Sequence, residues 1–169
     1  RQPEALVLSI GEELLQGRIA DSNAAELARE LLTLGFSVRR FLTVGDVPGD
    51  LQRALQELDG SVAVMVSSGG LGPTADDRVR AEAAAYAGAE LVAVPGAVEE
   101  LTQLFLRNLS EQAPKHFLAQ GFVPAGARPI GNASGTAWAF ALDLPRGTRY
   151  LALPGPPAEM RASLHAGGG

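Results

Sequence analysis

Two adjacent aspartates, Asp76 and Asp77, end a glycine-rich segment, Ser67–Asp77, that follows the apolar run of residues 62–66. A glycine-rich turn between a strand and a helix presents backbone N–H groups and the positive end of a helix dipole, which together bind phosphate. Two carboxylates in the same turn would repel a bare phosphate group. We therefore expect a divalent cation to bridge the carboxylates and a phosphorylated ligand, a combination that indicates nucleotide or phosphorylated-pterin chemistry.

Acidic residues also follow the two predicted strands that precede this segment. Glu12 and Glu13 come after the first strand, and Asp46 comes after the second. Carboxylate oxygens without histidine or cysteine favour Mg²⁺ or another hard divalent cation over zinc. We expect Asp76 and Asp77 to hold this cation, with Asp46 or Glu12 as a further ligand, so that a pyrophosphate is neutralised and water activated.

The glycine-rich segment has two other interpretations. Residues 70–75 satisfy the dinucleotide-binding pattern G-x-G-x-x-A, but they follow the third predicted strand instead of the first, and Pro73 lies within the turn. No acid ends the next strand either, which argues against a Rossmann dehydrogenase. Thr74 and Asp77 are spaced as a helix capping pair, so Asp77 taken alone is equally consistent with a structural role.

The hydrophobic pattern predicts alternating strands and helices that would position these acids. Predicted strands cover residues 5–10, 36–44, 62–66, 91–94, 136–142 and 149–153, and predicted helices cover residues 24–34, 51–58, 74–86, 97–109 and 158–165. The first three strands are too apolar to face water, so we expect a parallel α/β sheet with helices on both faces. Ligands bind such sheets where loops leave the carboxyl ends of the strands, which would bring the acids to one edge.

The composition limits the classes of function. The 169 residues, 46% of them hydrophobic and 20% charged, suit one globular domain, expected over residues 1–166 with the glycines 167–169 as a tail or linker. The net charge of −5 argues against a nucleic-acid or membrane surface, so the positive charge that a phosphate needs must be local, from Arg78 or Lys115. The absence of cysteine excludes disulfides and thiolate metal sites. No apolar run reaches spanning length, and we expect a cytoplasmic protein.

Three further segments have both a structural and a ligand-binding interpretation. Asn23 and Glu26 are spaced as a helix capping pair, which favours a structural role for both. Leu153–Met160 is a second strand–turn–helix junction, and Asn132–Ala137 is a turn of small polar residues. Each of these two is either a plain turn or a ligand contact.

Six segments, taken in order, resemble the N-terminal domain of the competence/damage-inducible protein (CinA) family, which shares the fold of the molybdopterin-binding domains of molybdenum cofactor biosynthesis. They are Gly11–Gly17, Asp21–Asn23, Val44–Asp46, Ser68–Asp77, Gly135–Ala137 and Leu153–Met160. The resemblance covers nearly the whole chain. It implies a three-layer α/β/α sandwich with a mostly parallel sheet that binds a nucleotide or pterin phosphate.

The resemblance implies one favoured function and two alternatives. CinA relatives are linked to metal-dependent hydrolysis of a nucleotide pyrophosphate such as ADP-ribose, and the long motifs favour this activity. The cofactor-assembly relatives imply molybdopterin binding or adenylyl transfer to molybdopterin, with Mg²⁺ and the acid near Asp77, and the remaining alternative is a ligand-binding module without turnover. Full-length members often add a C-terminal amidase domain. Pterin-binding relatives are commonly trimeric, so we expect a homo-oligomer, either a dimer or a trimer.

The residue pattern and the resemblance together give the expected site. Asp46, Asp76 and Asp77 are the candidate catalytic residues, and Glu12, Asp76 and Asp77 are the candidate metal ligands. The candidate ligand and phosphate contacts are Asn23, Ser68, Gly69, Gly70, Gly72, Thr74, Lys115, Gly135, Thr136, Pro154, Gly155 and Glu159.

The chain departs from the family pattern at three places. Glu12 stands where the family has a shorter aspartate, which would move a metal ligand. Trp138 and the residue after it stand where the family has Pro-Gly, and a tryptophan there would stack on a ring or block the pocket. Around Lys115 the family's asparagine and glutamine are replaced by Ala113 and His116, so only the lysine corresponds.

Overall fold

The computed structural model of the chain describes residues 1–109 and 111–167, so the predicted tail residues Gly168 and Gly169 lie outside it. Its centre is a six-stranded sheet in the order β2-β1-β3-β8-β7-β6. The strands are β1 (Glu4–Ile10), β2 (Ser37–Val44), β3 (Val64–Ser68), β6 (Arg128–Ile130), β7 (Ala139–Asp143) and β8 (Arg149–Leu153). β1 pairs in parallel with β2 and β3, and β3 pairs in parallel with β8.

The other edge of the sheet is antiparallel. β7 pairs antiparallel with both β6 and β8. A tight turn joins β7 to β8, in which the N–H of Leu144 donates to the carbonyl oxygen of Thr148 at 2.9 Å. A connection this short can only join antiparallel neighbours. The sheet is therefore mostly parallel, as predicted, with an antiparallel edge that the strand pattern did not reveal.

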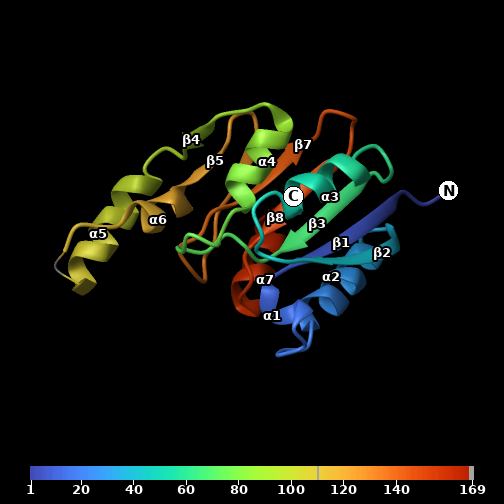
Figure 1. Cartoon of the computed structure of the whole chain (residues 1–169), viewed down its shortest axis with the longest axis horizontal. Helices are drawn as coiled ribbons and strands as arrows, with labels where there is room; N and C mark the ends of the chain where they lie inside the picture. The colour runs from blue at the N-terminus through green and yellow to red at the C-terminus, as the bar shows by residue number, and fades with distance from the viewer. Residues whose placement is uncertain (110, 168–169) are drawn as a thin grey trace.

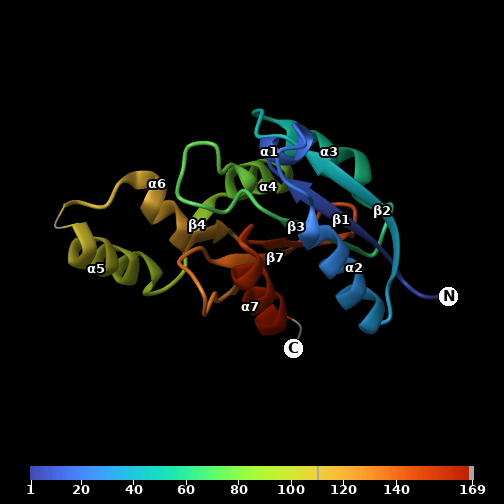
Figure 2. The ribbon, with the colours of Figure 1, turned by 90° about the horizontal axis from the view of Figure 1, so that it is seen from below.

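Helices cover both faces of the sheet, as the sequence predicted. α2 (Ser22–Thr33) and α7 (Pro157–Gly167) lie on one face, and α3 (Asp50–Leu58) and α4 (Val79–Ala87) lie on the other (Figure 1, Figure 2). The sheet between them is dry, since the side chains from Ala5 to Leu8 are at most 1% exposed. The three-layer α/β/α sandwich is thereby confirmed.

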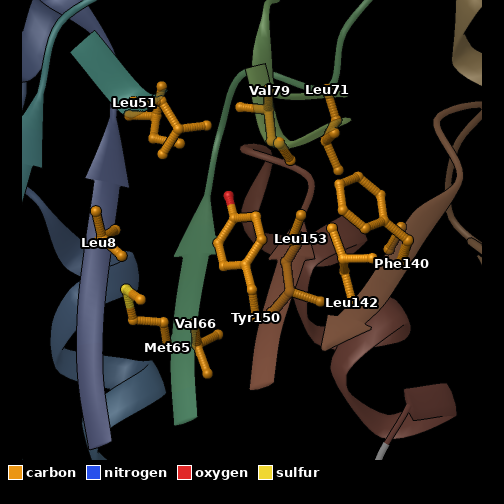
Figure 3. Packing of buried hydrophobic residues seen from close by; sticks show 14 of the residues in the cluster. Leu8, Leu51, Met65, Val66, Leu71, Val79, Phe140, Leu142, Tyr150 and Leu153 are labelled. Carbon is orange, nitrogen blue, oxygen red and sulfur yellow. The ribbon is translucent and has the colours of Figure 1, made fainter. Parts of the chain in front are cut away.

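The core beneath α3 and α4 is built around Tyr150 and Phe140 (Figure 3). Their rings meet edge to face, with centroids 6.1 Å apart and planes at 77°. The buried phenol of Tyr150 shares a hydrogen bond of 2.7 Å with the hydroxyl of Ser67, which is also buried. Burial raises the pKa of the Tyr150 phenol, so the pair stays neutral and β3 carries a serine in its dry interior without cost.

A small lobe extends beyond the sandwich (Figure 1). It contains β4 (Leu91–Ala93), α5 (Ala97–Leu109), α6 (Lys115–Leu118) and β5 (Phe122–Pro124). β4 and β5 pair antiparallel, and the rings of Phe105 and Phe117 pack with centroids 4.9 Å apart. The sequence predicted α5 but gave no prediction for α6 or β5, because elements of three or four residues leave no periodicity to detect.

Several boundaries differ from the predictions. The predicted loop of residues 11–17 contains a one-turn helix, α1 (Glu12–Leu15), and β7 starts at Ala139 instead of Thr136. α4 starts at Val79 instead of Thr74, so both aspartates of the glycine-rich segment lie in a loop before the helix.

The end of the described chain also differs from the prediction. Gly167, predicted as part of a tail, is the last residue of α7, and its carbonyl oxygen accepts a hydrogen bond of 2.7 Å from Nη2 of Arg128. None of the helices in residues 1–109 and 111–167 combines the length and the apolarity needed to cross a membrane.

Candidate functional site

A cavity of about 590 Å³ lies at the carboxyl ends of β1, β3 and β8, where the predicted parallel sheet would place a ligand. It collects residues from four loops that are far apart in the sequence. The predicted site residues that line it are Asn23, Asp46, Ser68, Gly69, Gly70, Gly72, Thr74, Asp76, Asp77 and Gly155. Asp46, Asp76 and Asp77, which follow two different strands, therefore lie in the same cavity, as the pattern of acids predicted.

The glycine-rich turn is shaped by close approaches of the backbone. At Gly69, φ is +103°, and an added Cβ would lie 2.3 Å from the carbonyl oxygen of Ile10. The N–H of Gly69 donates to the carbonyl oxygen of Leu153 at 3.0 Å, so it is not free to bind phosphate as predicted. Within the described residues, the N–H groups of Gly70, Leu71 and Gly72 make no hydrogen bond. Leu71 is fully buried and does not line the cavity, so the N–H groups of Gly70 and Gly72 are the part of the turn that remains for an anion.

Asp77 closes this loop and does not cap the helix. Its Oδ2 accepts hydrogen bonds from the N–H of Thr74 at 2.9 Å and from the hydroxyl of Thr74 at 2.7 Å. The residue in the capping position of α4 is Arg78, which makes no side-chain capping bond. The Asp77 carboxylate also fills the space over Gly72, where an added Cβ would lie 2.8 Å from Oδ2. The spacing of Thr74 and Asp77 thus correctly indicated a contact between the two residues, but this contact lies in the loop before α4 and not at a helix cap.

Asp46 lies in a strongly acidic environment. Burial raises the pKa of its carboxyl group, and a hydrogen bond of 3.1 Å from the N–H of Glu12 opposes this. The negative charges of Glu13, Asp76 and Glu12 raise the pKa further. The carboxylates of this cluster repel one another and would repel an anionic ligand. A bound cation would relieve this repulsion.

The predicted cation site agrees with the donor chemistry but is not preformed. Within the described residues, no three acidic or histidine side chains come close enough to form a metal-binding group. Mg²⁺ commonly takes one or two carboxylates and completes its shell with water and substrate phosphates. The carboxylates of Asp76 and Asp77, which both line the cavity, fit that arrangement, in which the ligand supplies the remaining oxygens. The cation itself stays a prediction.

The helix α1 changes which glutamate faces the cavity. Glu13 lines it, whereas Glu12 does not. The Glu12 carboxylate lies over Gly45, where an added Cβ would be 2.5 Å from Oε2, and it accepts a hydrogen bond from Gln16 at 3.4 Å. Consecutive helical residues point in different directions, so a loop prediction could not distinguish the two acids.

Part of the cavity lining forms an apolar wall. It consists of Leu14, Ile19, Ala20, Pro156 and Pro157. Ile19 is 54% exposed although it is a large aliphatic side chain, so a ligand would have apolar surface to cover there. The sequence prediction missed this wall, although Leu14, Pro156 and Pro157 lie in the segments Gly11–Gly17 and Leu153–Met160 that it singled out.

The predicted capping pair of Asn23 and Glu26 is wrong. Asp21 caps α2, since its Oδ1 accepts from the N–H of Ala24 at 3.0 Å, and it also accepts a hydrogen bond from the hydroxyl of Ser9. Asn23 Nδ2 instead donates to the carbonyl oxygen of Gly155 at 2.7 Å. Glu26 pairs with Arg161 at 2.9 Å. Asp21, which the sequence prediction missed as a site residue, lines the cavity together with Asn23.

Two predicted ligand contacts line a second, smaller cavity, and a third lies next to one of them. Gly135 and Thr136 line a space of about 170 Å³ against α5, together with Trp138. The hydroxyl of Thr136 donates to Oε1 of Gln120 at 2.8 Å. Glu159 lies directly over Gly135, where an added Cβ would be 2.2 Å from its carboxyl carbon. The tryptophan therefore neither blocks the main cavity nor lies within it.

The remaining predicted contacts are also outside the main cavity. Glu159 Oε2 accepts a hydrogen bond of 2.7 Å from Asn132, which fixes the turn before β7. Pro154 is buried and does not line the cavity. Lys115 is exposed in the lobe, at the start of α6. Arg78 lies nearer, in a small adjoining cavity that it shares with Asp46 and Asp76.

The chain is an α/β/α sandwich with a glycine-rich, acid-bearing cavity at the carboxyl edge of its sheet, and comparison with known proteins gives its family. The family model described as "Probable molybdopterin binding domain" matches residues 6–167. The chain belongs to this molybdopterin-binding domain family. The relatives that match the chain over most of its length include CinA-like proteins.

Relatives and solved structures agree with this assignment. The chain is 42% identical over 158 residues to a CinA-like protein of Geobacter sulfurreducens, covering 93% of the chain and 38% of that protein. A CinA-like protein of Geobacter metallireducens is 41% identical over 158 residues, with 94% and 38% covered. The chain thus spans well under half the length of these curated relatives.

Among solved structures, the protein CinA from Thermoplasma acidophilum superposes with a TM-score of 0.86 at 32% identity, covering 98% of this chain and 95% of that one. A molybdopterin biosynthesis protein from Mycobacterium abscessus has a TM-score of 0.65 at 17% identity, covering 97% and 88%. The second similarity concerns the fold alone.

Proposed function

We propose that this chain is a metal-dependent hydrolase of a nucleotide pyrophosphate such as ADP-ribose. The observation that carries the proposal is a single cavity that brings the unpaired N–H groups of the glycine-rich turn next to the carboxylates of Asp46, Asp76 and Asp77. Phosphate oxygens would accept hydrogen bonds from these N–H groups. A cation held by the carboxylates would also bind the phosphates. The similarity to CinA-like proteins favours the same class of ligand.

The polar and the apolar parts of the cavity lining suggest an orientation for the ligand. The pyrophosphate would lie against residues 70–72 and the acids. The nucleobase or pterin ring would lie against Leu14, Ile19 and Pro156, where the cavity is apolar. Planar rings bury apolar area on such walls, while a phosphate there would lose its hydration without a partner.

In the proposed reaction, water attacks one phosphorus of the pyrophosphate and the P–O–P bridge breaks. ADP-ribose and water would give AMP and ribose 5-phosphate. A bound divalent cation would neutralise the pyrophosphate and lower the pKa of water. The N–H groups of Gly70 and Gly72 would stabilise the charge that develops on the phosphoryl oxygens. Asp46, whose pKa is raised, is suited to accept the proton of the attacking water.

A hydrolysis screen tests the proposal. ADP-ribose, NAD and related dinucleotides are incubated with the chain and Mg²⁺ or Mn²⁺, and nucleotide products are separated by ion-exchange chromatography. We expect AMP from ADP-ribose, little product in the presence of EDTA, and a loss of turnover in D76N. Glu57→Gln is the matched control, because Glu57 is an exposed carboxylate on α3 away from the cavity. Metal-independent or absent turnover in the wild-type chain would contradict the proposal.

Molybdopterin binding or adenylyl transfer is the second candidate. The family model that matches the chain is described as a probable molybdopterin binding domain, which favours this candidate. Incubation with molybdopterin, ATP and Mg²⁺ would yield adenylylated molybdopterin and pyrophosphate if this candidate is correct. Binding of ADP-ribose or molybdopterin without turnover would instead indicate a ligand-binding module.

The assembly of the protein is also a proposal. We infer that the chain works as one domain of a longer protein, since it covers 38% of its CinA-like relatives, and the amidase domain stays an expectation for the remainder. A homo-oligomer, either a dimer or a trimer, likewise stays a prediction. Light scattering of the purified chain measures its mass directly.

A further inference from the structure

Arg80 is a buried cation beneath the glycine-rich turn. It lies in the first turn of α4 and is 3% exposed. Its Nη2 donates to the carbonyl oxygen of Leu71 at 2.8 Å and, more weakly, to that of Trp138 at 3.4 Å. The guanidinium thus joins the glycine-rich turn to the segment that leads into β7.

This guanidinium lacks the compensation that buried arginines usually have. No carboxylate of the described residues lies within 4.0 Å of it, and its Nε is buried without a hydrogen-bond partner. Burial lowers the pKa of Arg80 to about 10, and the negative charge of Asp77 opposes this. The group therefore remains charged at neutral pH, and an unpaired buried charge is costly unless it serves another charge.

The contact with Leu71 has a geometrical consequence for Gly72. In a planar trans peptide, the carbonyl oxygen and the following N–H point in opposite directions. Arg80 holds the Leu71 carbonyl from the side of α4, so the N–H of Gly72 is directed away from α4. The N–H of Val79 also donates to the carbonyl oxygen of Gly70 at 3.3 Å, which holds the turn against the start of α4.

The same contact also strengthens the donor. A cation on the carbonyl oxygen polarises the peptide group and makes its N–H a better hydrogen-bond donor. Gly72 lines the main cavity, where its N–H is unpaired. The acids of the cavity would otherwise repel an anionic ligand, and no basic side chain lines its walls.

We propose that Arg80 is a positioning residue for the anionic part of the ligand, aiming the N–H of Gly72 and supplying the buried positive charge that offsets a bound phosphate. This inference rests on the proposed phosphate site. It adds a residue that does not line the cavity and that no motif assigned.

Binding of two matched ligands tests the proposal. Calorimetry measures the affinity of the chain for AMP and for adenosine, which differ only in the phosphate. In R80Q we expect the affinity for AMP to fall about tenfold while that for adenosine changes at most about twofold, as expected for loss of a unit charge several ångströms away at an effective dielectric constant of about 20. Arg40→Gln is the matched control, because it removes the same charge from an exposed position on β2.

The design separates a charge effect from a structural one. If R80Q weakens AMP and adenosine equally, or leaves the affinity for AMP unchanged, the proposal is overturned. If R80Q does not fold, R80K is measured in its place, and the ratio of AMP to adenosine affinity must stay within about threefold of wild type because the charge is kept. A larger fall in that ratio overturns the proposal.

The outcomes also separate this inference from the proposed function. A wild-type chain that binds AMP but hydrolyses no pyrophosphate contradicts the hydrolase and leaves the role of Arg80 in place. A wild-type chain that binds neither AMP nor inorganic pyrophosphate contradicts both.

Discussion

Asn23 Nδ2 donates a hydrogen bond of 2.7 Å to the carbonyl oxygen of Gly155, joining the start of α2 to the turn between β8 and α7. The two residues are 132 positions apart in the chain, and both line the main cavity. Gly155 packs in turn on Gly69, since an added Cβ would lie 3.4 Å from the Cα of Gly69. This one amide therefore connects three of the loops that form the site.

Replacing Asn23 with alanine should loosen the cavity more than the fold. The loss of one neutral hydrogen bond is expected to lower the free energy of unfolding by about 1 kcal/mol. The affinity for AMP should fall by more than this stability loss suggests, because the Gly155 turn and the apolar wall next to it are no longer fixed. Urea denaturation and calorimetry measure the two effects. Asn108→Ala, at an exposed position of α5, is the control, and equal affinities in N23A and wild type would contradict the expectation.

Replacing Gly69 with alanine should be severely destabilising. Its φ of +103° disfavours an L side chain, and the new Cβ would lie 2.3 Å from the carbonyl oxygen of Ile10, which belongs to the rigid strand β1. We expect a loss of about 3 kcal/mol or more in the free energy of unfolding.

Gly126 provides the matched comparison for Gly69. Its φ is +85°, but an added Cβ there has no atom within 4 Å. Gly126→Ala should therefore cost only the conformational strain, about 1 kcal/mol. Similar midpoints of urea denaturation for the two variants would show that the approach of Ile10 is not the cause.

Asp59 should make the fold sensitive to acid. Burial of its carboxylate favours the neutral form, but hydrogen bonds from the N–H of Arg146 at 2.7 Å, the N–H of Thr148 at 3.1 Å and the hydroxyl of Tyr86 at 3.0 Å outweigh burial. The pKa of Asp59 is thereby lowered. The folded state then binds fewer protons than the unfolded state, so the stabilisation is complete above about pH 4 and is lost as the pH falls through the folded pKa.

The variant D59N tests this link. Its amide group would direct a donor at backbone N–H groups, so we expect a loss of about 2 kcal/mol at pH 7 and a much smaller difference from wild type near pH 3. Asp143→Asn is the control, because Asp143 pairs with Arg149 in solvent and should matter little. A difference between D59N and wild type that does not depend on pH would contradict the assignment.

Asp46 should determine the acid limb of any hydrolytic activity. Burial and the charges of Glu13, Asp76 and Glu12 raise the pKa of Asp46, and a carboxyl group accepts a proton only when it is ionised. Activity is therefore expected to fall as the pH drops through a pKa above about 4, the ordinary aspartate value. Raising the concentration of Mg²⁺ should move this limb to lower pH, because a cation favours the ionised form.

Measurement of kcat/KM for ADP-ribose against pH checks the role of Asp46. The variant D46N should have little activity at any pH, while binding AMP at least as tightly as wild type because a negative charge has been removed. An unchanged acid limb in D46N would assign the titration to another group.

Much of the fold could be predicted from the sequence because its elements have strong periodic patterns. The continuous apolar run of β1 and the helical stripes of α3 and α5 are visible along the chain, and their order implies a parallel sheet. The elements between residues 111 and 131 could not be predicted, since each is too short to show a period. The antiparallel edge depends on how β7 turns back at Leu144, which is a property of one connection.

The acidic and glycine residues of the candidate site could be predicted from the sequence, whereas their arrangement could be predicted only in part. Acids that follow successive parallel strands must reach the same edge of a sheet, and Asp46, Asp76 and Asp77 do so. The one-turn helix α1 decided that Glu13, and not Glu12, faces the cavity. Helix α4 begins after the aspartates, which made Asp77 a partner of Thr74 in the loop.

The sequence by itself determined the sandwich, the family and the glycine-rich, acid-bearing edge, because these follow from periodicity and from motifs that are contiguous in the chain. Only the tertiary structure decided which residues share the cavity, that Asn23 binds Gly155, and that the buried Arg80 donates to the carbonyl oxygen of Leu71. The reason is physical. Contacts between loops and the burial of a charge depend on how segments that are far apart in the chain pack together, and no local pattern of residue types encodes this packing.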